Sequence, residues 1–152
     1  MKRKAIFLDR DGVINESIIN LINYDEFVFL PNVAKSIKAF NKHNFLVIVV
    51  TNQPIISKGF CTIDDMNLIH KNMIKDLLAD GAHVDEVFFC PHHPEKGFKG
   101  EVQSLKKECN CRKPNPGLID KAAKKYSIDL SNSWMIGDSE VDILAGKASG
   151  VK

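Results

Sequence analysis

The sequence predicts an α/β fold in which a doubly wound, mainly parallel sheet is covered by helices on both faces. Four apolar runs, at residues 5–8, 45–50, 84–89 and 134–136, have the length and composition of buried strands. Apolar residues recur at helical spacing in the segments between these runs. Strands that alternate with helices are typical of a parallel sheet.

Length and composition indicate one globular domain that spans residues 1–152. Hydrophobic residues make up 44% of the chain and charged residues 26%, and the formal net charge of +2 is too small to favour a nucleic-acid partner. No apolar run approaches the roughly 18 residues of a membrane span. The basic start at residues 1–4 is followed by too few apolar residues for a signal peptide. We therefore expect a cytoplasmic protein, monomeric, with no membrane partner.

Four helices are expected, each with a start signal or an apolar face. Pro31 precedes the first helix, Thr62 and Asp65 resemble a capping box at the start of the second, and Gly81 is expected to end it. The residues expected to face the core are Val33, Ile37 and Phe40 in the first helix, Met66, Ile69, Met73 and Leu77 in the second, Leu118, Ile119, Ala122 and Tyr126 in the third, and Val141, Leu144, Ala145 and Ala148 in the fourth.

Two carboxylates follow the first strand. Asp9 and Asp11 come directly after the apolar run, and Gly12 marks a turn. Ligands of open α/β sheets bind outside the carboxyl ends of the strands, so this pair is a candidate metal and catalytic site. Arg10 lies between the two carboxylates and is expected, by strand-like alternation, to point to the opposite side and to take no part in the chemistry.

Polar residues also follow the later strands, and each has two interpretations. Thr51 and Asn52 could hold a phosphate oxygen or serve as ordinary turn residues. Asp138 could bind a metal or cap the next helix. Asp142 could brace the site or face solvent. Lys113 could balance carboxylates and phosphate, or be a solvated lysine.

Together these residues predict a site for Mg²⁺ and phosphate. Carboxylates, substrate phosphate and water are the ligands that Mg²⁺ prefers. Asp9 would be the nucleophile that forms an aspartyl-phosphate. Asp11 would protonate the leaving oxygen and then activate water. Mg²⁺ and Lys113 would neutralise charge on the phosphoryl group.

Three of the four cysteines lie within one segment and suggest a second metal. Two close pairs, Cys90 with His92 and Cys109 with Cys111, are separated by a 16-residue loop and match a closed Zn²⁺ site. His93 is a rival ligand, and free cysteines on a loop are the alternative interpretation. A closed site leaves no position for water, so this zinc would be structural.

The segment from Cys90 to Lys113 is basic. It carries six basic residues against three acidic ones. A basic loop beside the site suits a substrate with a second phosphate, although a solvated loop face would show the same excess. The residues are Lys96, Lys99, Lys106, Lys107, Arg112 and Lys113 against Glu95, Glu101 and Glu108.

The order of these motifs resembles that of the haloacid dehalogenase superfamily. The motifs are Asp9-Arg10-Asp11-Gly12, Thr51-Asn52-Gln53, Lys113 and Gly137-Asp138. The resemblance implies a Rossmann-like sheet in which Asp9 is the nucleophile and Asp11 the acid/base. It further implies that Thr51 and Lys113 hold phosphate, and that Asp9, Asp138 and the backbone carbonyl of Asp11 bind Mg²⁺.

The cysteine motif narrows the resemblance to the D-glycero-D-manno-heptose 1,7-bisphosphate 7-phosphatases. These enzymes of heptose and lipopolysaccharide precursor synthesis lack a large cap domain and use a zinc-bound loop. The resemblance implies His92 as the fourth zinc ligand, and Asn52 and Arg112 as substrate contacts. Histidinol-phosphate phosphatases share this layout and are the nearest alternative. Ser139 and residues 54–59 depart from the heptose pattern, which bears on substrate and anomer.

Three further expectations concern the whole chain. The resembling family continues beyond Lys152 with a strand and a helix, which this domain is expected to lack. Residues 15–29 form either a flap over the site or a surface loop. Two alternatives come from other functional classes. A receiver-like phosphoacceptor switch would need its phosphoacceptor after the third strand, whereas the acidic pair here follows the first. A non-catalytic zinc-binding module would leave Asp9, Asp11 and Asp138 unexplained.

Overall fold

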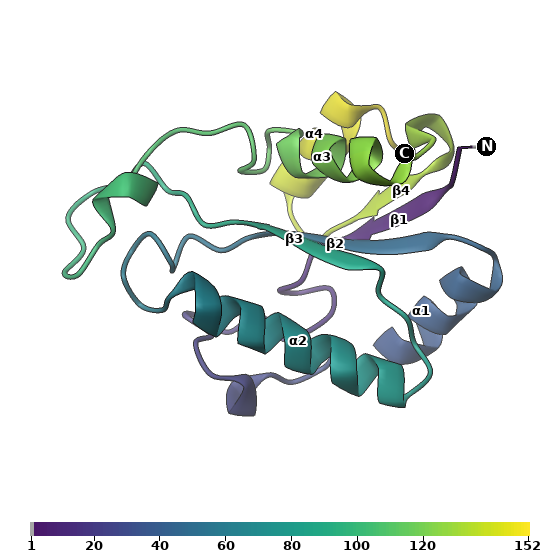
Figure 1. Ribbon diagram of the computed structural model, residues 1–152, viewed down its shortest axis with the longest axis horizontal. Helices are drawn as coiled ribbons and strands as arrows, with labels where there is room; N and C mark the ends of the chain where they lie inside the picture. The colour runs from purple at the N-terminus through teal and green to yellow at the C-terminus, as the bar shows by residue number, and fades with distance from the viewer. Residues whose placement is uncertain (1) are drawn as a thin grey trace.

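A computed structural model describes residues 2–152 as a four-stranded sheet in which every neighbouring pair is parallel. The strands are β1 (Ala5–Leu8), β2 (Leu46–Asn52), β3 (Glu86–Cys90) and β4 (Trp134–Ile136). Their order across the sheet is β3-β2-β1-β4 (Figure 1). The predicted α/β class with a parallel sheet is confirmed.

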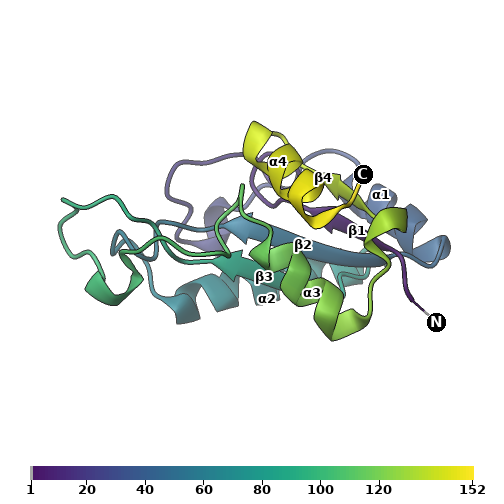
Figure 2. The same cartoon turned by 90° about the horizontal axis from the view of Figure 1, so that it is seen from above.

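Helices cover both faces of the sheet. In Figure 1, α1 (Val33–Lys42) and α2 (Ile63–Ala79) lie below it, and α3 (Gly117–Tyr126) and α4 (Glu140–Ser149) lie above it. Figure 2 shows the same arrangement from above. Within residues 2–152, none of the helices combines the length and apolar character that a membrane span requires. Short 3-10 turns occupy Tyr24–Glu26, Gln103–Leu105 and Leu130–Asn132.

Strand alternation divides the core into two layers. Ala5 and Phe7 of β1 pack with α3 and α4, whereas Ile6 and Leu8 pack with α1 and α2. All four side chains are at most 5% exposed, because a parallel sheet covered on both faces has no solvent side. Burial of this apolar surface is the main force that holds the sheet between its helices.

The predicted strand boundaries are correct for β1 and β4 and are shifted by one or two residues for β2 and β3. β2 continues through Thr51 and Asn52, because those residues pair with Phe89 and Cys90 of β3. The polar residues predicted to follow β2 therefore belong to the strand itself. β3 begins at Glu86, two residues later than predicted.

The helix signals are confirmed for the second helix. Thr62 and Asp65 form the predicted capping box, with Asp65 N donating to Thr62 Oγ1 at 3.1 Å and Thr62 N to Asp65 Oδ2 at 2.8 Å. Gly81 follows the C-cap Asp80 with φ of +78°, a conformation that favours glycine. Its amide donates to the carbonyl of Leu78, which ends the helix.

The predicted core face of the fourth helix is wrong at two positions. Leu144 is 43% exposed and Ala148 is also exposed, whereas Asp142, Ala145 and Gly146 are buried. The helix is turned so that Asp142 lies inside the protein. Its carboxylate is bonded to Lys113 there, and this ionic contact decides which face is buried.

Candidate active site and metal centre

The carboxyl ends of β1, β2 and β4 bring the predicted site residues together. Asp9 follows β1, Thr51 is the penultimate residue of β2 and Asp138 follows β4. The strands are parallel, so their ends meet at one edge of the sheet. This is the edge where ligands of open α/β sheets bind.

Lys113 is a buried cation at the centre of this edge. Its side chain is 2% exposed, and Nζ lies 2.9 Å from Asp9 Oδ1 and 2.6 Å from Asp142 Oδ1. Nζ also donates to the carbonyl oxygen of Val50 at 2.8 Å. Asp9 follows β1, Val50 lies in β2 and Asp142 lies in α4. The solvated-lysine interpretation is therefore wrong.

Asp9 is a nearly buried carboxylate whose charge is offset by Lys113. Burial raises its pKa, and the attraction of Lys113 opposes that rise. The backbone amide of Arg10 donates to Oδ1 at 2.8 Å, which also favours the charged form. The Asp9 residue remains 9% exposed, so its carboxylate is held in place and still reaches the surface of the site.

Three carboxylates form an acidic group beside Lys113. One oxygen from each of Asp9, Asp138 and Asp142 lies within 4.8 Å of the others. Asp142 is fully buried and accepts from Lys113 and from Ser139 Oγ at 2.8 Å, so it braces the site. Asp138 is exposed, and its carboxylate packs against Gly12, where a Cβ would clash with it. Asp9 and Asp138 are thus the carboxylates placed to take a hard cation.

Gln53 connects the hydroxyl of Thr51 with the carboxylate of Asp11. Its Nε2 donates to Thr51 Oγ1 at 3.0 Å and to Asp11 Oδ2 at 2.9 Å. Thr51 is 1% exposed and accepts this bond, so its own hydroxyl hydrogen remains free to donate. The sequence places Gln53 only in the motif Thr51-Asn52-Gln53 and predicts no role of its own for it.

Asp11 lies apart from the acidic group and is held by Arg10. Arg10 Nη2 donates to Oδ1 at 2.8 Å, and Asn15 Nδ2 donates to the same oxygen at 2.9 Å. Burial acts to raise the pKa of Asp11, but Arg10, Asn15 and Gln53 together hold it below its usual value. The expectation that Arg10 points away from Asp9 agrees with its contacts to Met66 and His70 of α2. Its side chain does leave the Asp9 side, but it turns back onto Asp11.

Two of the predicted substrate contacts adjoin Lys113: Asn52 bonds to its backbone and Arg112 precedes it in the chain. Asn52 pairs with the backbone of Lys113, accepting from its amide at 3.0 Å and donating to its carbonyl at 3.0 Å. Arg112 has a different environment: within residues 2–152, its Nη1 is buried and has no hydrogen-bond partner. A buried donor without a partner requires an explanation, and a ligand is one.

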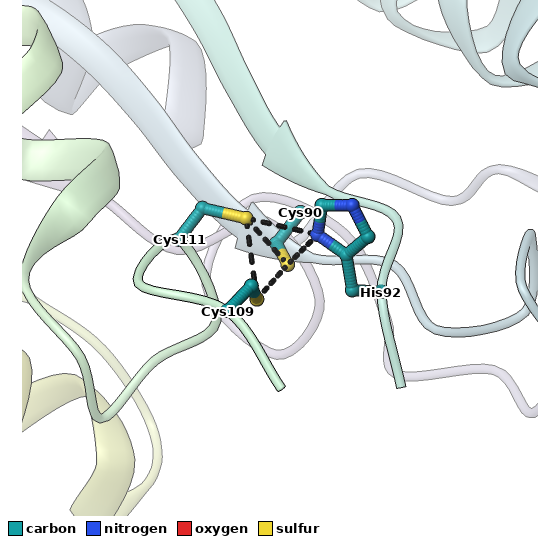
Figure 3. Close-up of side chains that lie close together, drawn as sticks. All are labelled: Cys90, His92, Cys109 and Cys111. Carbon is teal, nitrogen blue, oxygen red and sulfur yellow. Dashed lines mark hydrogen bonds between the residues drawn. The ribbon is translucent and has the colours of Figure 1, made fainter. Parts of the chain in front are cut away.

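The four predicted zinc ligands converge on one point (Figure 3). Cys90 Sγ lies 2.9 Å from Cys111 Sγ and 3.5 Å from Cys109 Sγ, and His92 Nδ1 lies 3.2 Å from Cys111 Sγ. Zinc with Zn–S bonds of about 2.3 Å would place tetrahedral sulfur atoms roughly 3.7 Å apart. Cys90 and Cys109 are near that spacing, whereas Cys90 and Cys111 would move apart to take the metal. The cysteines are not joined by disulfides.

The chemistry of the cluster suits a cation, and His92 is the histidine within it. Hydrogen bonds from Cys90 and His92 lower the pKa of Cys111, which favours a thiolate. His93 instead accepts from the amide of Glu95 through Nδ1 at 3.0 Å. The cluster can hold a metal, and its position at the end of β3 fixes the start of the loop that follows.

Residues 15–29 form a loop that is anchored at both ends and along its length. Glu16 N donates to Val28 O at 2.9 Å, which closes the base of the loop. Leu21 is 2% exposed, and Tyr24 Oη donates to Asp76 of α2 at 2.7 Å. The loop therefore packs against α2 in this structure.

Comparisons with known proteins agree on one family. A HAD-hydrolase-like family model matches residues 110–152. A D-glycero-alpha-D-manno-heptose-1,7-bisphosphate 7-phosphatase of Burkholderia mallei is 41% identical over 151 residues, which cover 99% of this chain and 78% of that protein. A D-glycero-beta-D-manno-heptose-1,7-bisphosphate 7-phosphatase of Rhodopseudomonas palustris is 37% identical over 150 residues, covering 99% of this chain and 81% of that protein.

A solved structure supports the same relationship. The D,D-heptose 1,7-bisphosphate phosphatase of B. bronchiseptica, complexed with magnesium and phosphate, superimposes with a TM-score of 0.83 at 34% identity. The match covers 97% of this chain and 77% of that one.

Replacement of Lys113 by methionine should destabilise the fold strongly. The change leaves Asp142 and Asp9 without their cation, and such losses cost about 3–5 kcal/mol of unfolding free energy. Without Lys113 the pKa of Asp9 rises further above its unfolded value. A carboxyl with a raised folded pKa favours the folded state at low pH, so the deficit should narrow between about pH 7 and pH 5.

Urea denaturation of the wild type and of Lys113→Met, at about pH 7 and at about pH 5, measures this loss of unfolding free energy. Lys75→Met, at an exposed position on α2, is the control and should change the free energy by less than about 0.5 kcal/mol. A Lys113→Met protein as stable as the Lys75→Met protein would contradict the account.

Proposed function

Because this chain belongs to the D-glycero-D-manno-heptose 1,7-bisphosphate 7-phosphatase family of the haloacid dehalogenase superfamily, we propose that it removes the 7-phosphate of a heptose 1,7-bisphosphate. The protein is then a phosphoric monoester hydrolase. The observation that carries the proposal is Lys113, buried between the carboxylates of Asp9 and Asp142 at the edge of the sheet.

The reaction proceeds in two steps on Asp9. Its carboxylate oxygen attacks phosphorus and the bond from phosphorus to the sugar oxygen breaks. Asp11 gives a proton to that oxygen, and it must first take this proton from water against its lowered pKa, a step that the negative charge of a bound phosphate beside it favours. Water then attacks phosphorus, Asp11 takes a proton from it, and the bond to Asp9 breaks to release phosphate. Lys113 and the Thr51 hydroxyl balance negative charge on the phosphoryl oxygens.

Mg²⁺ is the proposed cofactor of this step. The carboxylates of Asp9 and Asp138 and the backbone carbonyl of Asp11 would hold it, and Asp142 would support them through Lys113. Bound Mg²⁺ supplies positive charge that neutralises the transferring phosphoryl group. Asp9 is nearly buried, with its pKa raised mainly by burial, so a cation here would favour the charged nucleophile.

Zn²⁺ is the proposed occupant of the cysteine cluster, with a structural role. It would be held by Cys90, His92, Cys109 and Cys111. All four ligand positions are filled by protein, so no position is left for chemistry. The loop between the ligand pairs also packs on the loop after β2, where Val102 N donates to Ser57 O at 2.9 Å. Arg112 directly follows the ligand Cys111, so bound zinc would also fix the backbone position of Arg112.

The proposed substrate contacts are Thr51, Asn52, Arg112 and Lys113. Thr51 would donate to the transferring phosphate. The three donors of Lys113 already bond Asp9, Asp142 and Val50, so Lys113 would bind phosphate by exchanging one of these partners for a phosphate oxygen. Arg112 has a buried Nη1 with no partner within residues 2–152, which leaves a donor for a polar group of the substrate. The bonds of Asn52 to the backbone of Lys113 support this arrangement as well as any contact with the sugar.

The proposed setting is the cytoplasm, where heptose precursors of lipopolysaccharide are made. A small phosphorylated sugar is the partner that the family implies, and we propose that the protein acts as a monomer. The relatives include phosphatases named for the alpha and for the beta anomer, so the anomer is open to experiment.

One substrate panel tests the proposal. Phosphate release is measured from both anomers of heptose 1,7-bisphosphate and from histidinol phosphate, with Mg²⁺ and with a chelator in its place. We expect at least one heptose anomer to be the best substrate by kcat/KM and turnover to require Mg²⁺. If histidinol phosphate is much the best substrate, the heptose assignment fails. If none of the three releases phosphate, the phosphatase assignment fails.

Replacement of Cys109 by serine tests the zinc site. We expect about one zinc ion per chain in the wild type by elemental analysis, and a clear loss of zinc in the variant. Thermal unfolding should also occur at a lower temperature, because metal binding contributes folding free energy. Cys61→Ser is the matched control, since Cys61 lies outside the cluster. Equal zinc content in the two variants would refute this ligand set.

A further inference from the structure

Arg10 is a buried charge that the two-step reaction leaves unexplained. Its side chain is 1% exposed, and it is the largest of the fully buried side chains. Nη2 lies 2.8 Å and 3.1 Å from the two carboxylate oxygens of Asp11, and Nε lies 3.2 Å from Oδ1. The guanidinium thus grips the carboxylate through two nitrogens, a geometry that fixes orientation as well as distance.

The opposite end of the guanidinium is held by α2. Arg10 Nη1 lies 3.0 Å from His70 Nε2 and 3.2 Å from Met66 Sδ. His70 is 4% exposed, and burial together with the charge of Arg10 lowers its pKa to about 3. The imidazole is therefore neutral, and Nε2 accepts the bond from Nη1. His70 also packs at 5.4 Å against the ring of Phe89 on β3, which limits its movement.

We propose that Arg10 and His70 are positioning residues that hold the Asp11 carboxylate where it exchanges a proton with the sugar oxygen and then with water. The inference rests on the proposed function, because it assigns these residues to the acid/base step of that reaction. The connection runs from α2 through His70 and Arg10 to Asp11. Asn15 and Gln53 hold the same carboxylate from two other segments.

Burial of a charge favours this role over a purely structural one. A buried ion pair is often no more stabilising than apolar residues of similar volume, so Arg10 is a poor choice for filling the α2 face of the core. The contribution of the Arg10 guanidinium is to fix the orientation of the Asp11 carboxylate. A misplacement of about 1 Å in a reacting group can lower a rate roughly 100-fold.

Two esters with different leaving groups separate positioning from general damage. A sugar phosphate leaves as an alkoxide that needs a proton from Asp11, whereas 2,4-dinitrophenyl phosphate leaves as a stable phenolate that needs none. The value of kcat/KM covers only the steps up to formation of the phosphoenzyme. A misplaced Asp11 therefore lowers kcat/KM for the sugar phosphate and leaves the value for the aryl ester largely intact.

His70→Leu removes the acceptor for Arg10, and His70→Gln restores an acceptor at the position of Nε2. We expect His70→Leu to lower kcat/KM for the sugar phosphate by about 100-fold, within the range of general acid catalysis, and for the aryl ester by less than about 3-fold. His70→Gln should recover most of the loss. Ile69→Ala is the control, because Ile69 is buried on α2 outside these contacts and should affect both esters alike.

Each outcome decides the proposal. Equal losses on the two esters in His70→Leu, or no loss on either, would overturn the positioning role while leaving the phosphatase assignment intact. Failure of His70→Gln to recover the sugar phosphate rate would also count against it. A wild type that hydrolyses neither ester would instead overturn the phosphatase assignment, and this role with it.

Discussion

The buried ammonium group of Lys113 is the interaction on which the rest of this site depends. It joins Asp9 after β1, the carbonyl of Val50 in β2 and Asp142 of α4, at distances of 2.6–2.9 Å. A buried carboxylate without a cation is unfavourable, so each of these groups holds the others in place. The close approach also requires Gly137, where a Cβ would clash with the Asp142 carboxylate.

The bend that follows β1 gives the two aspartates of the first motif different surroundings. Asp9 lies with Lys113 on the side of the sheet covered by α3 and α4, and Asp11 is connected through Arg10 to α2 on the other side. A nucleophile needs a fixed position against phosphate and metal. An acid/base group needs a separate environment. Strand alternation alone would put residues 9 and 11 on one side, so the bend at Arg10, just beyond the end of β1, is what separates them.

Local signals predicted most of the fold and the residues that gather in the two acidic and cysteine clusters, but contacts between distant residues could not be predicted. The apolar run of β1 and each of the two cysteine pairs lie within a few residues, so a local sequence pattern is enough to find them. His70 lies on the apolar face of α2, 60 positions from Arg10, and nothing around it distinguishes it from a core residue. Leu144 was assigned to the core because periodicity cannot show that Asp142 is drawn inside by Lys113.

The nucleophile assignment is tested most directly by trapping the covalent intermediate. The enzyme is mixed with heptose 1,7-bisphosphate and Mg²⁺, stopped in acid within milliseconds, digested and analysed by mass spectrometry, with Asp9→Asn as the control. The account predicts a phosphoryl group on Asp9 that is absent from the variant and absent without Mg²⁺. A phosphoryl group on another residue, or turnover by Asp9→Asn, would contradict it.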